Sequence, residues 1–366
     1  MPINQLLKFK RELNKIAELA WEEEKTTNYI LENIPIKPIQ KGFNNKNVGL
    51  LYKIGKGNNS ILLRADIDAL KTKNGIKHIC GHSTHMASLM QTLLTTNKLI
   101  NKLDSKNKSI YFLFQPSEEN FPSGAKAFID ENQNLIKKIS YAFSIHVRPL
   151  MNLDTLGLRD GAIWARGDYF EIKIFGKMVH IKNAPSGIDA LEISAKIILF
   201  IKALQSKYIN KIRVNIGVIN GGRQANTVAD EALLKGDFRV YDEKFKIKIK
   251  LLLEKRLKEI EKETLGKIEL SYFDGTPPVI NNKQLTLKIM NYLNKNSNFK
   301  IISNIELKSF GCEDFAYITN NIPSLDCLIG TGDKYDIHEE ICTISDKGTE
   351  NAFKYFSKIV TWFIKN

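Results

Sequence analysis

The alternation of apolar strand-like runs with helical stretches constrains the fold of this chain more than any other feature. Up to about residue 163, the apolar runs SILLRADID, IYFLFQP and YAFSIHV are separated by stretches with helical spacing, such as ASLMQTLLTTNKLI. Strands that alternate with helices predict a largely parallel sheet with helices on both faces, and continuous apolar runs are typical of buried strands. We therefore expect an α/β domain, with a first helix at about residues 4–32.

The pattern changes near residue 164. From there the order is strand, helix, strand, strand, helix, strand, ending with KIELSYF. This order fits a four-stranded sheet backed by two helices, the ferredoxin-like α+β arrangement. We therefore predict one domain from residues 1–163 and 275–366, and an inserted domain at residues 164–274. Ser345 is a candidate N-cap for a helix at the C-terminal end.

The composition is that of a globular protein, with 43% hydrophobic and 26% charged residues. The net charge of +14 would suit a nucleic-acid partner, but the basic residues are spread along the chain and form no nucleic-acid-binding motif. No apolar stretch is long enough to cross a bilayer, and the N-terminal region lacks the features of a signal peptide. Four cysteines in so long a chain indicate no disulfide framework, so we expect a cytoplasmic protein without nucleic-acid or membrane partners.

Side chains that bind metals lie at the ends of the predicted strands. Half of the six histidines and one of the four cysteines fall within HICGHSTH at residues 78–85. Asp66 and Asp68 end one strand, Glu118 follows another, and ligands bind beyond the carboxyl ends of strands in an open parallel sheet. Five groups are therefore expected to converge as metal ligands: Cys80, His82, Glu119, His146 and His338.

These five residues form a donor set of thiolate, imidazole and carboxylate. Such a set suits zinc, and manganese and cobalt stay open. Taken singly, each residue has a simpler interpretation, since His146 alone would be a hydrogen-bonded core histidine and Cys80 a small buried side chain. The adjacent glutamates fit a division of labour in which one binds metal and the other takes a proton from a metal-activated water.

Eight ordered motifs carry a resemblance over nearly the whole chain. They are RADIDAL, HICGHSTH, FQPSEE with SGAKAFI, SIHV, GKMVH, INGGRQANTVADEALLKGDFRVYD, GCEDFAY and DIHEE. This series resembles the aminoacylase/carboxypeptidase metallohydrolase family, in the branch of hippurate hydrolase, auxin-conjugate amidohydrolases and N-acetyldiaminopimelate deacetylase.

The resemblance implies a two-metal catalytic domain with an inserted lid domain that dimerises. It implies that Cys80 bridges two divalent ions and that Glu118 is the general base. In the lid, His180 would bind the scissile carbonyl oxygen or the tetrahedral intermediate. Asn226 and Arg239 would hold the carboxylate of the substrate, for which the fork of an arginine is suited.

Two departures from the family pattern affect the site. Ser83 stands where the family has an aspartate, and it is expected to cap the following helix. Met178 and Val179 replace a Gly-Gly pair before His180, which makes that backbone stiffer.

The predicted function is a metal-dependent amidohydrolase that cleaves N-acyl amino acids or short peptides. One alternative is a di- or aminopeptidase of the same fold. Two less favoured alternatives are a thiol hydrolase with Cys80 as nucleophile and a binding protein without activity. The intact Glu118 disfavours the binding protein, which would not need a base.

Overall fold

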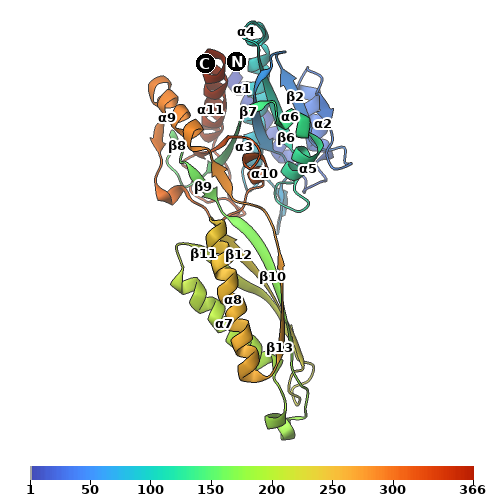
Figure 1. The fold of residues 1–366 in the computed structure, drawn as a ribbon. Coiled ribbons are helices and arrows are strands. Elements are labelled where there is room, and N and C mark those ends of the chain that lie inside the picture. The colour runs from blue at the N-terminus through green and yellow to red at the C-terminus, as the bar shows by residue number, and fades with distance from the viewer. Residues whose placement is uncertain (1) are drawn as a thin grey trace. The chain divides into compact units, whose positions relative to one another are not determined.

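The computed structural model describes residues 2–366 and divides into two compact units (Figure 1). The first comprises the chain up to Ile163, Val279–Leu307 and Glu313–Asn366. The second comprises Trp164–Pro278 and the short segment Lys308–Cys312, which the sequence prediction assigned to the first domain.

The first unit is built on an eight-stranded sheet in the order β1-β2-β6-β3-β7-β16-β8-β15. Its centre is parallel, because β3 pairs in parallel with β6 and β7, and β7 with β16. The predicted α/β class with a mostly parallel sheet is thus confirmed. The strands are β1 (Gln40–Lys41), β2 (Leu50–Ile54), β3 (Asn59–Asp66), β6 (Lys108–Gln115), β7 (Ile139–Arg148), β8 (Thr155–Gly157), β15 (Lys300–Ile302) and β16 (Ser324–Gly330).

Helices cover both faces of this sheet. The chain steps from β3 to β6 through α3 and returns past β3 to β7 through α5 and α6. Because such crossovers are right-handed, steps in opposite directions place their helices on opposite faces. α1 and α11 pack against α3, and α10 packs against α5. The helices are α1 (Pro2–Lys15), α2 (Glu24–Asn33), α3 (His82–Asn97), α4 (Ile100–Ser105), α5 (Gly124–Glu131), α6 (Gln133–Ile136), α9 (Lys283–Asn296), α10 (Phe315–Thr319) and α11 (Asp346–Lys365).

The N-terminal region differs from its prediction. In place of one helix at about 4–32, α1 ends at Lys15 and α2 begins at Glu24. Trp21 has a φ of 64°, which no helix accommodates. The side chain of Glu18 accepts hydrogen bonds from the backbone N–H groups of Lys25 and Thr26, so it satisfies the start of the second helix.

Shorter elements complete the first unit. A hairpin of β4 (Leu70–Thr72) and β5 (Gly75–Lys77) precedes the HICGHSTH segment, and β9 (Gly161–Trp164) pairs with β14 (Val279–Asn281). Ser345 caps α11 as predicted, since its side chain accepts the backbone N–H of Gly348. None of the helices in residues 2–366 combines the length and apolar character needed to cross a bilayer.

The second unit is a four-stranded antiparallel sheet in the order β11-β12-β10-β13, with α7 and α8 packed on it. This strand order and connectivity confirm the ferredoxin-like prediction. Alternate residues of β10 are buried, as its sequence pattern indicates. The elements are β10 (Arg166–Phe175), η1 (Ile181–Ser186), α7 (Ala190–Lys207), β11 (Ile212–Gly221), β12 (Glu231–Val240), α8 (Glu243–Thr264) and β13 (Lys267–Phe273).

Candidate active site

The five predicted metal ligands come from four loops or strands of the first unit. Cys80 precedes the start of α3 and His82 is its first residue. Glu119 lies in the loop after β6, His146 near the carboxyl end of β7, and His338 in the loop after β16. β6, β7 and β16 belong to the parallel centre of the sheet, so their carboxyl ends share one edge.

The structure brings these five side chains into two groups that share Cys80. In one group, the donor atoms of Cys80, His82 and His146 lie within 4.8 Å of one another. In the other, the same holds for Cys80, Glu119 and His338, with 2.6 Å between Cys80 Sγ and His338 Nε2. A cysteine shared by two groups of donors suits two cations bound side by side.

Backbone carbonyl groups orient two of the histidines. His82 Nδ1 donates to the carbonyl oxygen of Asp68 at 2.9 Å, and His146 Nδ1 donates to that of Val147 at 2.9 Å. A hydrogen bond of this kind fixes the tautomer and leaves Nε2 with a lone pair for a metal.

Unsatisfied acceptors show that the donor set fits divalent cations. His82 Nε2 and Glu119 Oε1 are both buried and accept no hydrogen bond within the described chain. Buried polar atoms normally have partners, so two such acceptors 3.8 Å apart indicate a missing positive partner. Their chemical types suit zinc, manganese or cobalt.

The acidic surroundings perturb the titration of these groups. Burial, Glu119 and Glu118 raise the pKa of the Cys80 thiol well above its usual value. Burial, Glu313 and Glu119 likewise raise the pKa of Glu118. Burial lowers the pKa of His82, but the carboxylates of Asp66 and Asp68 outweigh it and raise the pKa to about 10. The site therefore favours positive charge.

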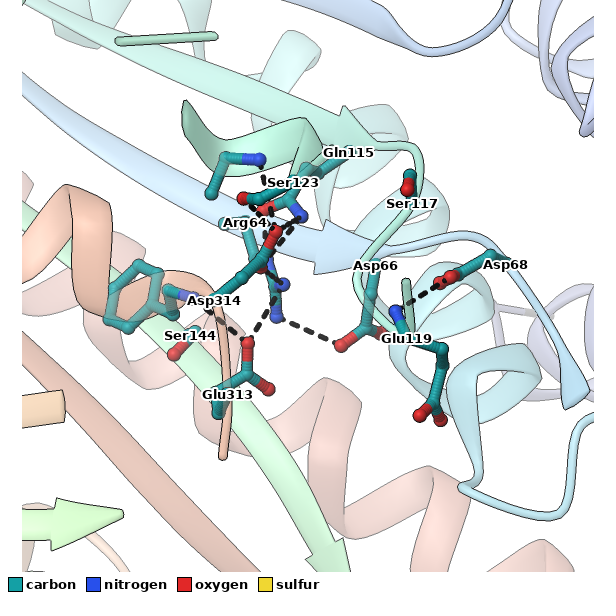
Figure 2. A network of polar contacts seen from close by, with 12 residues as sticks. Arg64, Asp66, Asp68, Gln115, Ser117, Glu119, Ser123, Ser144, Glu313 and Asp314 are labelled. Atoms are coloured by element: carbon teal, nitrogen blue, oxygen red, sulfur yellow. Dashed lines mark hydrogen bonds and ion pairs between the residues drawn. The ribbon is translucent and has the colours of Figure 1, made fainter. Parts of the chain in front are cut away.

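Asp68 supports the two ligand groups in a way that sequence reasoning missed. Its Oδ2 accepts the backbone N–H of Glu119 at 2.9 Å (Figure 2). Its carbonyl oxygen orients His82. Asp66 orients a further histidine, since His85 Nδ1 donates to Asp66 Oδ1 at 2.7 Å and His85 Nε2 accepts the N–H of Val147. The sequence signal was the placement of both aspartates at the end of a buried strand.

A buried arginine lies at the centre of the network in Figure 2. Arg64 is 1% exposed and forms ion pairs with Asp66, Glu313 and Asp314 at 2.8–2.9 Å. Asp314 also accepts hydrogen bonds from Gln115 and from the hydroxyl of Ser123, at the two ends of the loop that carries Glu118. An arginine inside the apolar run SILLRADID was the signal that could have revealed this network.

The second unit places its three predicted residues in two locations. His180 and Asn226 are exposed neighbours, because residue 180 bridges to Thr227 and Ile181 N–H donates to the carbonyl oxygen of Asn226. His180 follows β10 and Asn226 precedes β12, at the end of the sheet where Phe175 pairs with Glu231.

Arg239 lies near the opposite end of β12, where it pairs with Gly167. Glu231 and Arg239 are eight positions apart in β12, which is about 25 Å of extended strand. The guanidinium of Arg239 donates to both carboxylate oxygens of Asp237, and its Nη1 donates to Cys312 Sγ at 2.9 Å. One lid therefore does not bring Arg239 next to His180 and Asn226.

The two departures from the family pattern have different outcomes. Ser83 does not cap α3, which corrects the expectation: the N-cap is Gly81, with a φ of 88°, and Ser83 lies buried inside the first turn. The side chain of Met178 is 39% exposed, so its bulk lies partly in solvent. His180 accepts the N–H of Lys182 through Nδ1, which caps η1.

Comparisons with known proteins agree with this geometry. The model of peptidase family M20/M25/M40 matches residues 62–362. The N-acetyl-L-cysteine deacetylase of Bacillus subtilis (strain 168) is 29% identical over 370 residues, which cover 96% of this chain and 86% of that relative. The N-acetyldiaminopimelate deacetylase of Bacillus cytotoxicus is 25% identical over 382 residues, which cover 99% of both.

A solved structure shares the fold. The YXEP protein of Bacillus subtilis, described as a dinuclear metal binding peptidase from the M20 family, has a TM-score of 0.85 and 24% identity. That similarity covers 100% of this chain and 99% of the YXEP chain.

These matches confirm the predicted resemblance and the prediction of an enzyme that hydrolyses amide bonds. They extend over most of the sequence, including the five predicted ligand positions and Glu118. The chain belongs to peptidase family M20/M25/M40.

Proposed function

We propose that this protein is a metal-dependent amidohydrolase that releases a free amino acid from a small N-acyl amino acid. The observation that carries the proposal is the pair of donor groups that share Cys80, with the carboxyl group of Glu118 beside them. The two deacetylase relatives support an N-acetyl amino acid as the first substrate to test.

The proposed ligands of two divalent ions are the five residues of the two groups. Cys80, His82 and His146 would hold one ion, and Cys80, Glu119 and His338 the other. Zinc and manganese are the first candidates, and cobalt is the third. When bound, such ions would polarise the scissile carbonyl group and lower the pKa of a water molecule.

Glu118 is the proposed general base. A carboxylate oxygen of Glu118 lies within 4.8 Å of donor atoms of His82 and Glu119, although neither donor group needs Glu118 as a member. From this position it would take a proton from the attacking water and deliver it to the leaving nitrogen. Proton transfer by a positioned side chain contributes roughly 10²–10⁴-fold to a rate.

A thiol mechanism fits the same residues less well. A nucleophilic cysteine needs a lowered pKa, and burial and neighbouring carboxylates raise the pKa of Cys80. Cys80 therefore suits a metal ligand, whose deprotonation the bound cation would favour.

The second unit is proposed as a lid that completes the substrate site. His180 would donate to the oxygen that becomes negative during attack, and Asn226 and Arg239 would hold the substrate carboxylate. Arg239 lies about 25 Å along β12 from Glu231, at the end of the strand that Asn226 precedes, and this length exceeds that of a small N-acyl amino acid. This separation supports a site to which two copies of the lid contribute.

We further propose a homodimer formed through the second unit. β11 is an edge strand of its sheet, and it carries the exposed side chains of Val218 and Ile219. On α7, which packs against β11, Leu191 and Leu199 are also exposed, the latter by 69%. Sedimentation velocity at micromolar concentration should give a dimer, and Leu199→Lys should shift it towards the monomer.

The location proposed for this enzyme is a reducing compartment such as the cytoplasm. All four cysteines are free, including Cys80, which must stay reduced to bind metal.

A small substrate panel tests the proposed reaction. The metal-reconstituted protein should release amino acids from N-acetyl amino acids, and a chelator should stop the release. Analogues with an amidated carboxylate should be poor substrates, because they lack the charge that Arg239 would bind. Cleavage limited to peptides with a free amine would replace the proposal with a di- or aminopeptidase, and activity that resists chelation would favour the thiol hydrolase.

A further inference from the structure

The connection between α1 and α2 contains a buried glutamate that the proposed mechanism does not use. Glu23 is the N-cap residue of α2, and its side chain does not cap that helix. It is 0% exposed, although glutamates are almost never fully buried without a paired charge.

The side chain of Glu23 reaches the loop that carries Glu118 and Glu119. Its Oε1 accepts the backbone N–H of Ser117 at 2.7 Å, 94 residues away in the sequence. Ser117 has a φ of 48°, a conformation that a residue other than glycine rarely adopts and that surrounding contacts must hold. Its hydroxyl donates to the carbonyl oxygens of Asn120 and Pro122, so this one residue organises the whole turn.

A second contact joins the same two segments. The indole Nε1 of Trp21 donates to the carbonyl oxygen of Pro122 at 2.6 Å. The break in the N-terminal helix therefore presents two side chains, from Trp21 and Glu23, to the loop at residues 116–123.

The second carboxyl oxygen of Glu23 differs from the first. Glu23 Oε2 is buried and takes part in no hydrogen bond within the described residues. Burial and the negative charge of Asp68 raise the pKa of Glu23 to about 8. A buried carboxyl group without a cation is costly, so a residue that only filled space would be apolar.

Glu23 and Asp68 act on the same short segment. Asp68 accepts the N–H of Glu119, and Glu23 accepts the N–H of Ser117, so two carboxyl groups fix the backbone on either side of Glu118. We propose that Glu23 is a positioning residue that holds the loop at residues 117–119, so that Glu118 and Glu119 face the metal site. This inference rests on the roles proposed above for those two glutamates.

The test compares two variants of nearly equal size. Glu23→Gln keeps an acceptor for Ser117 N–H, whereas Glu23→Met removes it without leaving a cavity. Glu18→Ala is a matched control, because Glu18 lies in the same connection and accepts its hydrogen bonds from the start of α2. The measurements are Co²⁺ affinity of the metal-free protein, followed by visible absorption, its melting temperature, and kcat and KM for an N-acetyl amino acid.

Glu23→Met should weaken Co²⁺ binding by roughly 10–100-fold, as the loss of other outer partners of metal ligands does, and should lower kcat more than it raises KM. Glu23→Gln should keep its Co²⁺ affinity and kcat within about threefold of the wild-type values, because the acceptor for Ser117 N–H is retained. Glu18→Ala should lower the melting temperature without changing Co²⁺ affinity.

Two results would overturn parts of this picture, and they are distinguishable. If the wild-type protein binds Co²⁺ and hydrolyses its substrate while Glu23→Met matches Glu23→Gln in affinity and kcat, Glu23 is only a packing residue. If the wild-type protein binds no divalent ion, the proposed function itself fails. Should Glu23→Met not fold, a Glu23→Gln protein with weakened Co²⁺ binding would also overturn the proposal, because the acceptor is still present.

Discussion

The proposed catalytic residues of the first unit and those of the second differ in how their side chains are held. His82 donates to the backbone carbonyl oxygen of Asp68, and the backbone N–H of Glu119 donates to the Asp68 side chain. Arg64 forms ion pairs with three carboxylates. His180 and Asn226 are exposed and joined mainly through backbone contacts. The first unit thus holds its side chains in place by itself, whereas the role proposed for the second unit would need the substrate or another subunit to bring its residues together.

Removal of metal ions should have the largest effect, because the ions would polarise the scissile carbonyl group and activate the attacking water. Hydrolysis should fall to background after chelation and return on addition of Zn²⁺, Mn²⁺ or Co²⁺. Elemental analysis of the active protein should give about two ions per chain, as in other two-metal hydrolases. Full activity at a metal content near zero would contradict the proposal that the first unit acts through bound metal ions.

Replacement of the base should come next. Glu118→Gln should lower kcat by roughly 10²–10⁴-fold with metal content nearly unchanged. Glu119→Gln, one position away, is the matched control and should instead weaken metal binding. If the two phenotypes are exchanged, the roles of the pair are the reverse of those proposed.

The buried arginine should matter more for stability than its counterpart in the second unit. Arg64→Ala leaves Asp66, Glu313 and Asp314 without their cation, which should cost about 3–5 kcal/mol of unfolding free energy. Arg166 also pairs with a buried aspartate, Asp168, but Lys246 pairs with that aspartate as well. Urea denaturation of the metal-free proteins should therefore show a smaller loss of unfolding free energy for Arg166→Ala than for Arg64→Ala. Equal losses would show that the two ion-pair networks contribute equally to stability.

The exposed histidine should affect the kinetics and not the metal content. His180→Ala should lower kcat by roughly 10²-fold, the effect of losing one donor to a developing negative charge, with metal content unchanged. Lys182→Ala in the same exposed turn is the control. A wild-type kcat for His180→Ala would show that the second unit takes no part in the chemical step.

The smallest effect is expected at Arg239. Its guanidinium is bonded to Asp237 and Cys312 in this structure, so substrate binding would exchange one set of partners for another. Arg239→Ala should raise KM roughly tenfold, the worth of one charged hydrogen bond, with little change in kcat. An amidated substrate should be insensitive to the substitution, and equal sensitivity would place Arg239 outside the carboxylate site.

Local sequence determined the elements and the positions of the proposed ligands. The alternating apolar runs predicted the parallel sheet, and the change of order near residue 164 predicted the ferredoxin-like unit. Glu119 and His146 were identifiable because each lies near the end of a strand whose apolar pattern is visible in the sequence, and Cys80 and His82 because they stand two residues apart in a cluster of histidines. These features depend on spacing along the chain, which the sequence displays directly.

Only the tertiary structure decided which of these groups support one another. Arg64 meets Asp314 across 250 residues, and Glu23 meets Ser117 across 94. The helical spacing of the N-terminal region predicted an unbroken helix, yet the chain breaks at residues 16–23 and places Glu23 in the core. Helical periodicity reports which residues share a face, but the energy of a buried carboxyl group depends on partners that distant segments supply.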